Sequence, residues 1–411
     1  MDGRTTPPTQ IHGECDPRFA AVAEEFLRNF VERGEVGAAV AIFLRGDPVV
    51  DLWGGVADPV AGSPWRRDTL ALGYSATKGM AATCLAILID RGLVAVDEPV
   101  ATYWPAFAAN GKAGVTVGMA LSHQAGLPYW EMPVPDGGLF DWNLVTSALA
   151  AQKPAWEPGM GHGYHGLTSG FIWGEIVRRV TGTTIGSFLR DEVARPLGAD
   201  VWIGLPESEH QRVAQMILPE QAPAPSQDEL SPDVRERLRL LSNCGGAFAA
   251  DTIASAAFRL AEIPAAGGMV SARGLARVYA PLSLDGEIDG VRIVDPGLLP
   301  ALREVRSASS HDRLLGIATS FTLGFSQSWG DRALGPGYQM IIGEKAFGTP
   351  GLGGSIGFAD GEAGLSFAYV MNRLGPGVAL NERGQALVDA AYNAVGYSCA
   401  HRGRAFTASR R

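Results

Sequence analysis

Residues 73–92 decide the fold, and they read GYSATKGMAATCLAILIDRG. Apolar residues fill the run after Lys78, and Gly92 stands where a helix would end, so we expect a helix that is buried on nearly all sides. Ser75 and Lys78 are three positions apart, which puts both side chains on one face of the first turn. A serine is a weak nucleophile until a neighbouring base takes its proton. The stretch therefore predicts a nucleophile and its base at a helix start.

Lys78 can be that base only while its amine is neutral. Burial and the positive end of a helix both disfavour the charged amine, so a closed cleft at this place would lower its pKa. The alternative is that Ser75 only caps the helix and Lys78 lies on the surface. Only four of the 34 lysine and arginine residues are lysines, and Lys78 alone among them follows a serine at this spacing.

Strand-like segments lie toward both ends of the chain. They are rich in β-branched and aromatic residues and are bounded by turn residues, at residues 36–44, 49–53, 323–326, 355–359 and 365–371. Helices are expected at residues 19–33 and 381–395. The chain begins with a hairpin, continues with helices and ends with strands and a helix. This order indicates an α/β fold of the α+β type, with an antiparallel sheet flanked by helices.

At 411 residues the chain is long for one core, so two lobes are expected. We predict an α/β domain from residues 1–95 and 285–411, and an inserted, mainly helical domain from residues 96–284. A polar, proline-rich stretch lies inside residues 205–230. It predicts an exposed, lid-like loop over a cleft.

Charge and hydropathy exclude several classes of partner. A net charge of −9 and a pI near 5.4 argue against nucleic acid. Basic residues cluster only in the tail, at residues 401–404 and 410–411, where we expect a frayed, solvated end and not a binding arm. No apolar run reaches membrane-spanning length, and the first residues lack the apolar core of a signal peptide, so a cytoplasmic protein without a membrane partner is expected. The oligomeric state stays open.

Cysteine and histidine give little sign of a metal or a cofactor. The four cysteines are scattered without paired spacing, which favours reduced thiols. His162 and His165 form an H-x-x-H pair, but no third ligand stands near them in sequence. We therefore expect neither a metal nor a cofactor.

Further motifs accompany the Ser75 helix, namely LSHQAGLP at 121–128, WEPG at 156–159 followed by GYH at 163–165, GGSIGF at 353–358 and MNR at 371–373. With these motifs the chain resembles the serine β-lactamase and penicillin-binding-protein superfamily over roughly residues 20–395. The likeness is greatest to the class C β-lactamase-like branch that includes family VIII carboxylesterases.

The resemblance implies three catalytic residues. Ser75 would be the nucleophile, Lys78 its proton acceptor, and Tyr164 the group that relays protons to and from the leaving group. A tyrosine beside a cationic lysine has its pKa lowered and can share the base function, so which of the two holds the proton stays open. The alternative for Tyr164 is a buried core tyrosine with a satisfied hydroxyl.

The resemblance also implies where a substrate would lie. A tetrahedral oxyanion needs two donors, which would be the N–H groups of Ser75 and Leu352. Gly351 and Gly353 would let the substrate approach that strand edge. The residues themselves suggest an aromatic-rimmed pocket for a medium-sized apolar or aromatic group, lined by Trp130 and His165 together with Tyr129 and Trp156. The alternative for each of them is a place in the core.

Two departures from the family pattern bear on the substrate. Class C β-lactamases carry Tyr-x-Asn, whereas this chain has Tyr164, His165 and Gly166. The superfamily has Lys-Thr-Gly, or a histidine in place of that lysine, where this chain has Thr-Pro-Gly at 349–351. Without that cation no group holds a β-lactam carboxylate, which favours a neutral ester. Lys345 could compensate only if the strand were bulged.

A rival nucleophile is Ser355, because GGSIG at 353–357 matches the G-x-S-x-G elbow of α/β-hydrolases. That elbow requires a helix after the serine, followed by an acid and a histidine. The segment after Ser355 is strand-like and only His401 follows it, so we interpret Ser355 as a turn or strand residue.

The sequence thus predicts a cytoplasmic serine esterase that cleaves small to medium esters through an acyl-enzyme on Ser75. An acyltransferase or amide hydrolase on the same scaffold is the second hypothesis. A catalytically silent binding protein is the third, because fold does not imply function.

Overall fold

The computed structural model describes residues 10–219, 236, 239–330, 333, 335–400 and 404–409. Its main sheet has seven strands, in the order β1-β3-β2-β14-β13-β12, with β4 paired to β3. The strands are β1 Ile11–Cys15, β2 Gly37–Leu44, β3 Asp47–Asp58, β4 Ser63–Pro64, β12 Phe347–Pro350, β13 Ile356–Asp360 and β14 Leu365–Met371. Every neighbouring pair in this sheet is antiparallel.

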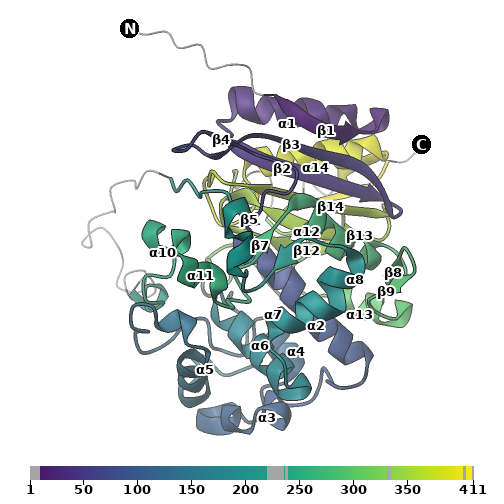
Figure 1. The fold of residues 1–411 in the computed structure, drawn as a ribbon. Helices are drawn as coiled ribbons and strands as arrows, with labels where there is room; N and C mark the ends of the chain where they lie inside the picture. The colour runs from purple at the N-terminus through teal and green to yellow at the C-terminus, as the bar shows by residue number, and fades with distance from the viewer. Residues whose placement is uncertain are drawn as a thin grey trace.

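Strands from the two ends of the chain meet in the middle of this sheet (Figure 1). Strand β14 pairs with β2 along its whole length, with Tyr369 opposite Val40. The predicted antiparallel sheet built from both ends of the chain is therefore confirmed.

Smaller strand pairs join the loops around the main sheet. They are β5 Ala71–Leu72, β6 Val201–Trp202 and β7 Met269–Val270 in one three-stranded sheet, and the hairpins β8 Glu287–Ile288 with β9 Val291–Arg292, β10 Ser307–Ser309 with β11 Thr319–Phe321, and β15 Tyr397–Ala400 with β16 Ala405–Ala408. Strand β5 leads directly into the Ser75 turn.

The described chain also contains α-helices between and after these strands. They are α1 Ala20–Glu32, α2 Thr77–Asp90, α3 Val100–Tyr103, α4 Val117–Leu121, α5 Trp142–Ala151, α6 Thr168–Thr181, α7 Ile185–Leu189, α8 Arg195–Leu197, α10 Ala250–Ala254, α11 Ala256–Leu260, α12 Ala272–Tyr279, α13 Leu299–Arg303 and α14 Glu382–Ala394. None of the helices in the described ranges is both long enough and apolar enough to cross a membrane.

Helices cover both faces of the sheet. Phe358 of β13 stacks on Tyr392 of α14, while a Cβ on the adjacent Gly357 would meet Tyr279 of α12. Successive strand residues point to opposite faces, so α14 and α12 lie on opposite sides. Helix α1 packs beside α14, and both lie on the outer face in Figure 1.

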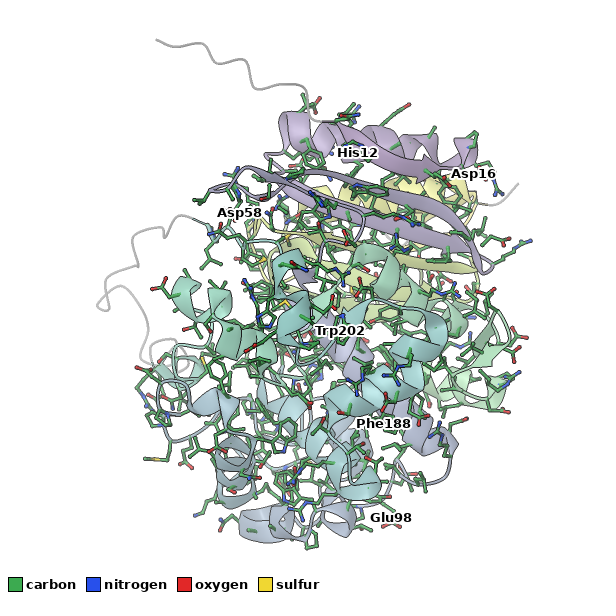
Figure 2. The ribbon with its side chains drawn as sticks, in the orientation of Figure 1. His12, Asp16, Asp58, Glu98, Phe188 and Trp202 are labelled. Atoms are coloured by element: carbon green, nitrogen blue, oxygen red, sulfur yellow. The ribbon has the colours of Figure 1, made fainter. Side chains whose placement is uncertain are left out.

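The helical part of the molecule lies on the α12 side of the sheet. Figure 2 shows His12 of β1 at one end of the molecule and Glu98 at the other, with Trp202 of β6 between them. The two-lobe division at residues 95 and 285 stays a prediction. Helix α12 falls inside the range expected for the helical lobe, yet it packs against β2, β13 and β14.

One local expectation is wrong. Residues 323 and 324 form a bend, and of the strand expected at 323–326 only Ser326 makes isolated bridges, to Phe321 and Gly348. The reason is that Gly324 has φ +85° and packs where a Cβ would lie 2.6 Å from Ala82 of α2. The frayed end is expected at residues 401–404 and 410–411, of which the structure describes Arg404 alone, so it stays a prediction. Two residues further on, Phe406 is buried and stacks on Tyr392 at 4.5 Å.

The lid-like loop predicted at 205–230 is described only as far as residue 219. Its first part is a short 3-10 helix, Glu207–Arg212, followed by bridges from Val213 to Leu70 and from Ile217 to Arg373. These bridges hold residues 213–217 to the rest of the fold. Residues 220–230 lie outside the described residues, so the lid stays a prediction.

Candidate active site

Ser75 lies in a tight turn between β5 and α2. The turn is a 3-10 helix, Tyr74–Ala76, and Tyr74 takes a left-handed φ of +46° that is uncommon for a non-glycine residue. Thr77 fixes the turn, because its hydroxyl donates to the Tyr74 carbonyl at 2.6 Å and accepts from the Gly268 N–H at 2.9 Å. The serine is thereby held half-buried at the start of a buried helix.

The Ser75 hydroxyl lies between two catalytic candidates. Tyr164 donates its hydroxyl to Ser75 Oγ at 2.8 Å, and Lys78 Nζ lies 3.3 Å from the same oxygen. Lys78 Nζ also donates to the carbonyl of Gly166 at 2.7 Å and to that of Ala265 at 2.9 Å. The structure therefore brings together Ser75, Lys78 and Tyr164, which the sequence singled out.

Lys78 is fully buried, and its surroundings favour a neutral amine. Burial lowers its pKa well below the ordinary lysine value of 10.5, and no ion pair joins it to any carboxylate of the described residues. A neutral amine has two N–H donors and one lone pair. With the donors directed at the Gly166 and Ala265 carbonyls, the lone pair faces the Ser75 hydroxyl. This arrangement can accept the serine proton.

Tyr164 differs from the expectation that a neighbouring lysine would lower its pKa. Burial raises the pKa of Tyr164 above its ordinary value, the hydrogen bond to Ser75 opposes the shift, and the Asp312 charge adds to it. The Lys78 amine lies 4.8 Å from the centre of the tyrosine ring, over its face. Tyr164 therefore keeps its proton at neutral pH and serves as a hydrogen-bond donor to Ser75.

Asp312 is a residue that the sequence did not reveal. Its buried carboxylate accepts the backbone N–H of Tyr164 through both oxygens, each at 3.1 Å, and also the N–H groups of Leu314 and Leu315. The Thr319 hydroxyl donates to it at 3.1 Å, and His162 Nε2 lies 3.6 Å away. Asp312 thus fixes the backbone that carries Tyr164, although 148 residues separate the two in sequence.

Two backbone donors are available for an oxyanion. Within the described part of the chain, neither the Ser75 N–H nor the Leu352 N–H donates to a carbonyl. Leu352 begins the 3-10 helix Leu352–Gly354, whose first N–H has no partner inside the helix. A Cβ on Gly351 would lie 2.3 Å from the Gly73 carbonyl, so this strand end abuts the Ser75 turn directly.

A cavity of about 360 Å³ opens above Ser75. The described residues that line it are aromatic, aliphatic or small: Tyr74, Ser75, Pro128, Tyr129, Trp130, Tyr164, Gly166, Leu167, Leu240, Leu241, Cys244, Phe248, Ala266, Leu315, Leu352 and Val378. None of them is charged. We call this space the reaction cavity.

Some predicted contacts lie outside the reaction cavity. His165 is buried, with Nε2 accepting the Leu127 N–H at 2.8 Å and Nδ1 donating to the Gly163 carbonyl at 2.7 Å. Burial lowers its pKa to about 3, so it is a neutral structural histidine, and the expectation that it rims the pocket is wrong. Trp156 lines a neighbouring cavity instead. Gly351 and Gly353 support the strand edge but do not line the reaction cavity.

Ser355 does not have the geometry of a nucleophile elbow. Its side chain is buried and donates to the Gly73 carbonyl at 3.0 Å, and β13 follows it in place of a helix. Ser355 therefore ties the β12–β13 connection to the Ser75 turn. Lys345 gives no substitute cation, because its exposed amine pairs with Glu362 at 2.8 Å.

No group of three or more His, Cys, Asp or Glu side chains in the described ranges is arranged to hold a metal ion. His162 and His165, the H-x-x-H pair, bond to different partners: His162 lies 2.8 Å from Thr319 Oγ1, and His165 bonds the backbone.

Comparison with known proteins gives consistent matches. The Beta-lactamase family model matches residues 21–392. The esterase/beta-lactamase LipL of Mycobacterium tuberculosis is 38% identical over 377 residues, which cover 89% of this chain and 83% of that protein. The crystal structure of a family VIII carboxylesterase superposes with a TM-score of 0.82 at 38% identity, covering 94% of this chain and 100% of that one. A penicillin-binding protein homologue from Caulobacter crescentus gives a TM-score of 0.81 at 40% identity, with the same coverage.

Proposed function

The chain belongs to the beta-lactamase family and is a serine carboxylic-ester hydrolase, and from this premise we propose that it cleaves esters through an acyl-enzyme on Ser75. The observation that carries the proposal is the position of Ser75 Oγ, 2.8 Å from the Tyr164 hydroxyl and 3.3 Å from the Lys78 amine. One neighbour can take a proton and the other can give one.

In the acylation step, neutral Lys78 takes the proton of Ser75 while Oγ attacks the ester carbonyl carbon. The carbonyl oxygen becomes an oxyanion that faces the N–H groups of Ser75 and Leu352. When the C–O bond breaks, Tyr164 gives its proton to the leaving alcohol oxygen and recovers one from Lys78. The products of this step are a Ser75 ester and the free alcohol.

In the second step a water molecule attacks the acyl carbon of the Ser75 ester. Its proton passes to the pair formed by Lys78 and Tyr164, and the serine oxygen leaves with a proton returned by that pair. The same oxyanion donors act again. The acid product is released and Ser75 is restored.

The reaction cavity favours small to medium, largely apolar ester groups. Its volume of about 360 Å³ lies near the lower end of the range for small-molecule sites, and no charged side chain of the described residues lines it. A β-lactam would place its carboxylate near the attacked carbonyl, where no charged side chain among the described lining residues compensates it. A cytoplasmic location also remains a prediction, which cell fractionation would test.

The test is intact-protein mass spectrometry after incubation with a fluorophosphonate, together with hydrolysis of p-nitrophenyl butyrate. We expect one adduct on the wild-type protein, no adduct on Ser75→Ala, and an unchanged adduct on the matched control Ser355→Ala. An adduct that persists in Ser75→Ala and disappears in Ser355→Ala would overturn the assignment. A wild-type protein that neither labels nor hydrolyses would support a silent binding protein.

A further inference from the structure

A second cavity adjoins the reaction cavity and has a different chemistry. Its volume is about 510 Å³, and it shares the wall residues Pro128, Tyr129 and Leu240 with the reaction cavity. Its other described lining residues are Ala155, Trp156, Glu236, His311, Arg313 and Leu314. A substrate longer than the reaction cavity would extend past the shared wall into this space, which we call the Arg313 cavity.

The Arg313 guanidinium is held in place. It lies over the Trp156 ring, 5.3 Å from the ring centre, and its Nη2 donates to the Met160 carbonyl at 3.1 Å. A Cβ on Gly161 would lie 3.0 to 3.2 Å from three atoms of this guanidinium, so the glycine makes room for it. Because stacking and the hydrogen bond already restrict the guanidinium, it loses less conformational entropy when it binds a ligand.

Arg313 has no carboxylate partner of its own among the described residues. The adjacent Asp312 carboxylate accepts hydrogen bonds from three backbone N–H groups and the Thr319 hydroxyl. Glu236, the acidic residue in the cavity wall, is paired with Arg239 through two bonds of 2.7 and 2.8 Å. Among the described residues that line this cavity, Arg313 is thus a fixed cation without a carboxylate partner, and the His311 side chain also lies at the wall.

We propose that the Arg313 cavity binds a carboxylate of the substrate, so that the enzyme acts on esters whose acyl or alcohol part carries a carboxylate several atoms from the scissile bond. This inference rests on the proposed function of Ser75. Arginine matches a carboxylate with two parallel N–H donors, which gives orientation as well as attraction. The charge-free reaction cavity and the cationic one beside it then bind the two halves of one molecule.

The experiment compares matched ester pairs that differ only in a carboxylate. For the acyl part the pair is mono-4-nitrophenyl adipate and 4-nitrophenyl hexanoate. For the alcohol part it is 3-carboxyphenyl butyrate and 3-(methoxycarbonyl)phenyl butyrate. The quantity measured is the ratio of kcat/KM for the anionic ester to that for the neutral ester, in wild type, in Arg313→Gln and in Arg195→Gln. Arg195 is an exposed arginine of α8 that lines neither cavity.

We expect the anionic ester to be preferred about three- to tenfold in at least one pair, because an exposed guanidinium is partly screened by solvent. The pair that shows the preference identifies the part of the ester that enters the Arg313 cavity. The preference should disappear in Arg313→Gln, persist in Arg195→Gln and weaken with added salt. Arg313→Lys should keep part of it, which provides a second variant if the glutamine variant does not fold.

A wild-type ratio near one in both pairs, or a preference that Arg313→Gln leaves intact, would overturn the inference while the neutral esters still report an active Ser75. Loss of all hydrolysis in the wild-type protein would instead count against the proposed function. The two failures are thus distinguishable.

Discussion

Two buried clusters in this molecule each combine a tyrosine hydroxyl with a basic side chain. They differ in the group that these two side chains contact, which is a carboxylate in one cluster and a serine hydroxyl in the other. At Glu35, Arg383 donates to the carboxylate at 2.6 Å and Tyr369 donates to its other oxygen. At Ser75, Lys78 and Tyr164 contact a neutral hydroxyl. The first cluster compensates its cation with an acid, whereas the second does not.

That difference separates a structural cluster from a reactive one. An arginine stays charged in a protein, so its burial needs the Glu35 carboxylate. A lysine without such a partner loses its proton instead, and burial lowers the pKa of Lys78 accordingly. No acidic side chain of the described residues pairs with Lys78, and this allows its amine to act as a base.

The largest expected effect comes from removing the base. Lys78→Met should lower kcat/KM for p-nitrophenyl butyrate by about a thousandfold, and Lys78→Arg should do the same because an arginine cannot give up its proton. The matched control is Lys112→Met, since Lys112 is also buried and donates to two carbonyls but has no contact with Ser75. Normal hydrolysis by Lys78→Met would contradict the mechanism.

Breaking the other cluster should affect stability and not chemistry. Glu35→Gln leaves Arg383 buried without a counter-charge, which should cost about 3 kcal/mol of unfolding free energy. Urea unfolding followed by tryptophan fluorescence measures this loss. The kcat of the folded protein should stay at the wild-type value, and a selective loss of kcat would show that the two clusters are not separate in function.

Asp312 combines features of both clusters. Its buried carboxylate is compensated by N–H donors, as in a structural cluster, but one of those donors belongs to the catalytic candidate Tyr164. Asp312→Asn replaces one of the two oxygens that accept the Tyr164 N–H with an NH2 donor, and it should lower kcat about tenfold with little change in KM. Asp295→Asn provides the control, as Asp295 accepts the Gly297 N–H in an exposed turn. A change confined to the melting temperature would mean that Asp312 supports only the fold.

The most gradual effect is a pH dependence of stability. The pKa of Lys78 is lowered in the folded state, so between that value and 10.5 the unfolded chain binds the extra proton. Stability therefore rises with pH in this window, by at most about 1.4 kcal/mol per pH unit. Lys78→Met should be more stable than wild type at pH 6, and its advantage should shrink toward pH 10. A constant difference between pH 6 and 10 would contradict a neutral Lys78.

The sequence predicted the elements whose local pattern is strong. The strand-like apolar run at 365–371 and the apolar run after Lys78 both appear where expected, as β14 and α2. Strand β1 was missed because its Gly13 takes φ +107° against Asp51 and most of its residues are exposed, which leaves no alternation to detect. Periodicity reports burial on one face, so an exposed edge strand gives little signal.

The catalytic triad candidates were found because motifs carry them, but their supports were not. Asp312 holds the backbone of Tyr164 from 148 residues away in sequence, and no spacing rule connects the two. Glu35 in the structural cluster and Arg313 in the neighbouring cavity gave no sequence signal either. His165 shows the reverse error, since its position beside Tyr164 in sequence suggested a substrate contact that its buried ring does not make.

The pairing of β2 with β14 has a consequence for biosynthesis. Val40 is synthesised early, but its partner Tyr369 is synthesised near the end of the chain. The central sheet can therefore form only after the ribosome has made most of the protein. The carbonyls that direct the Lys78 amine belong to Gly166 and Ala265, which also emerge long after Ser75. In a nascent chain Ser75 therefore lacks an oriented base, and it becomes a reactive nucleophile only in the finished protein.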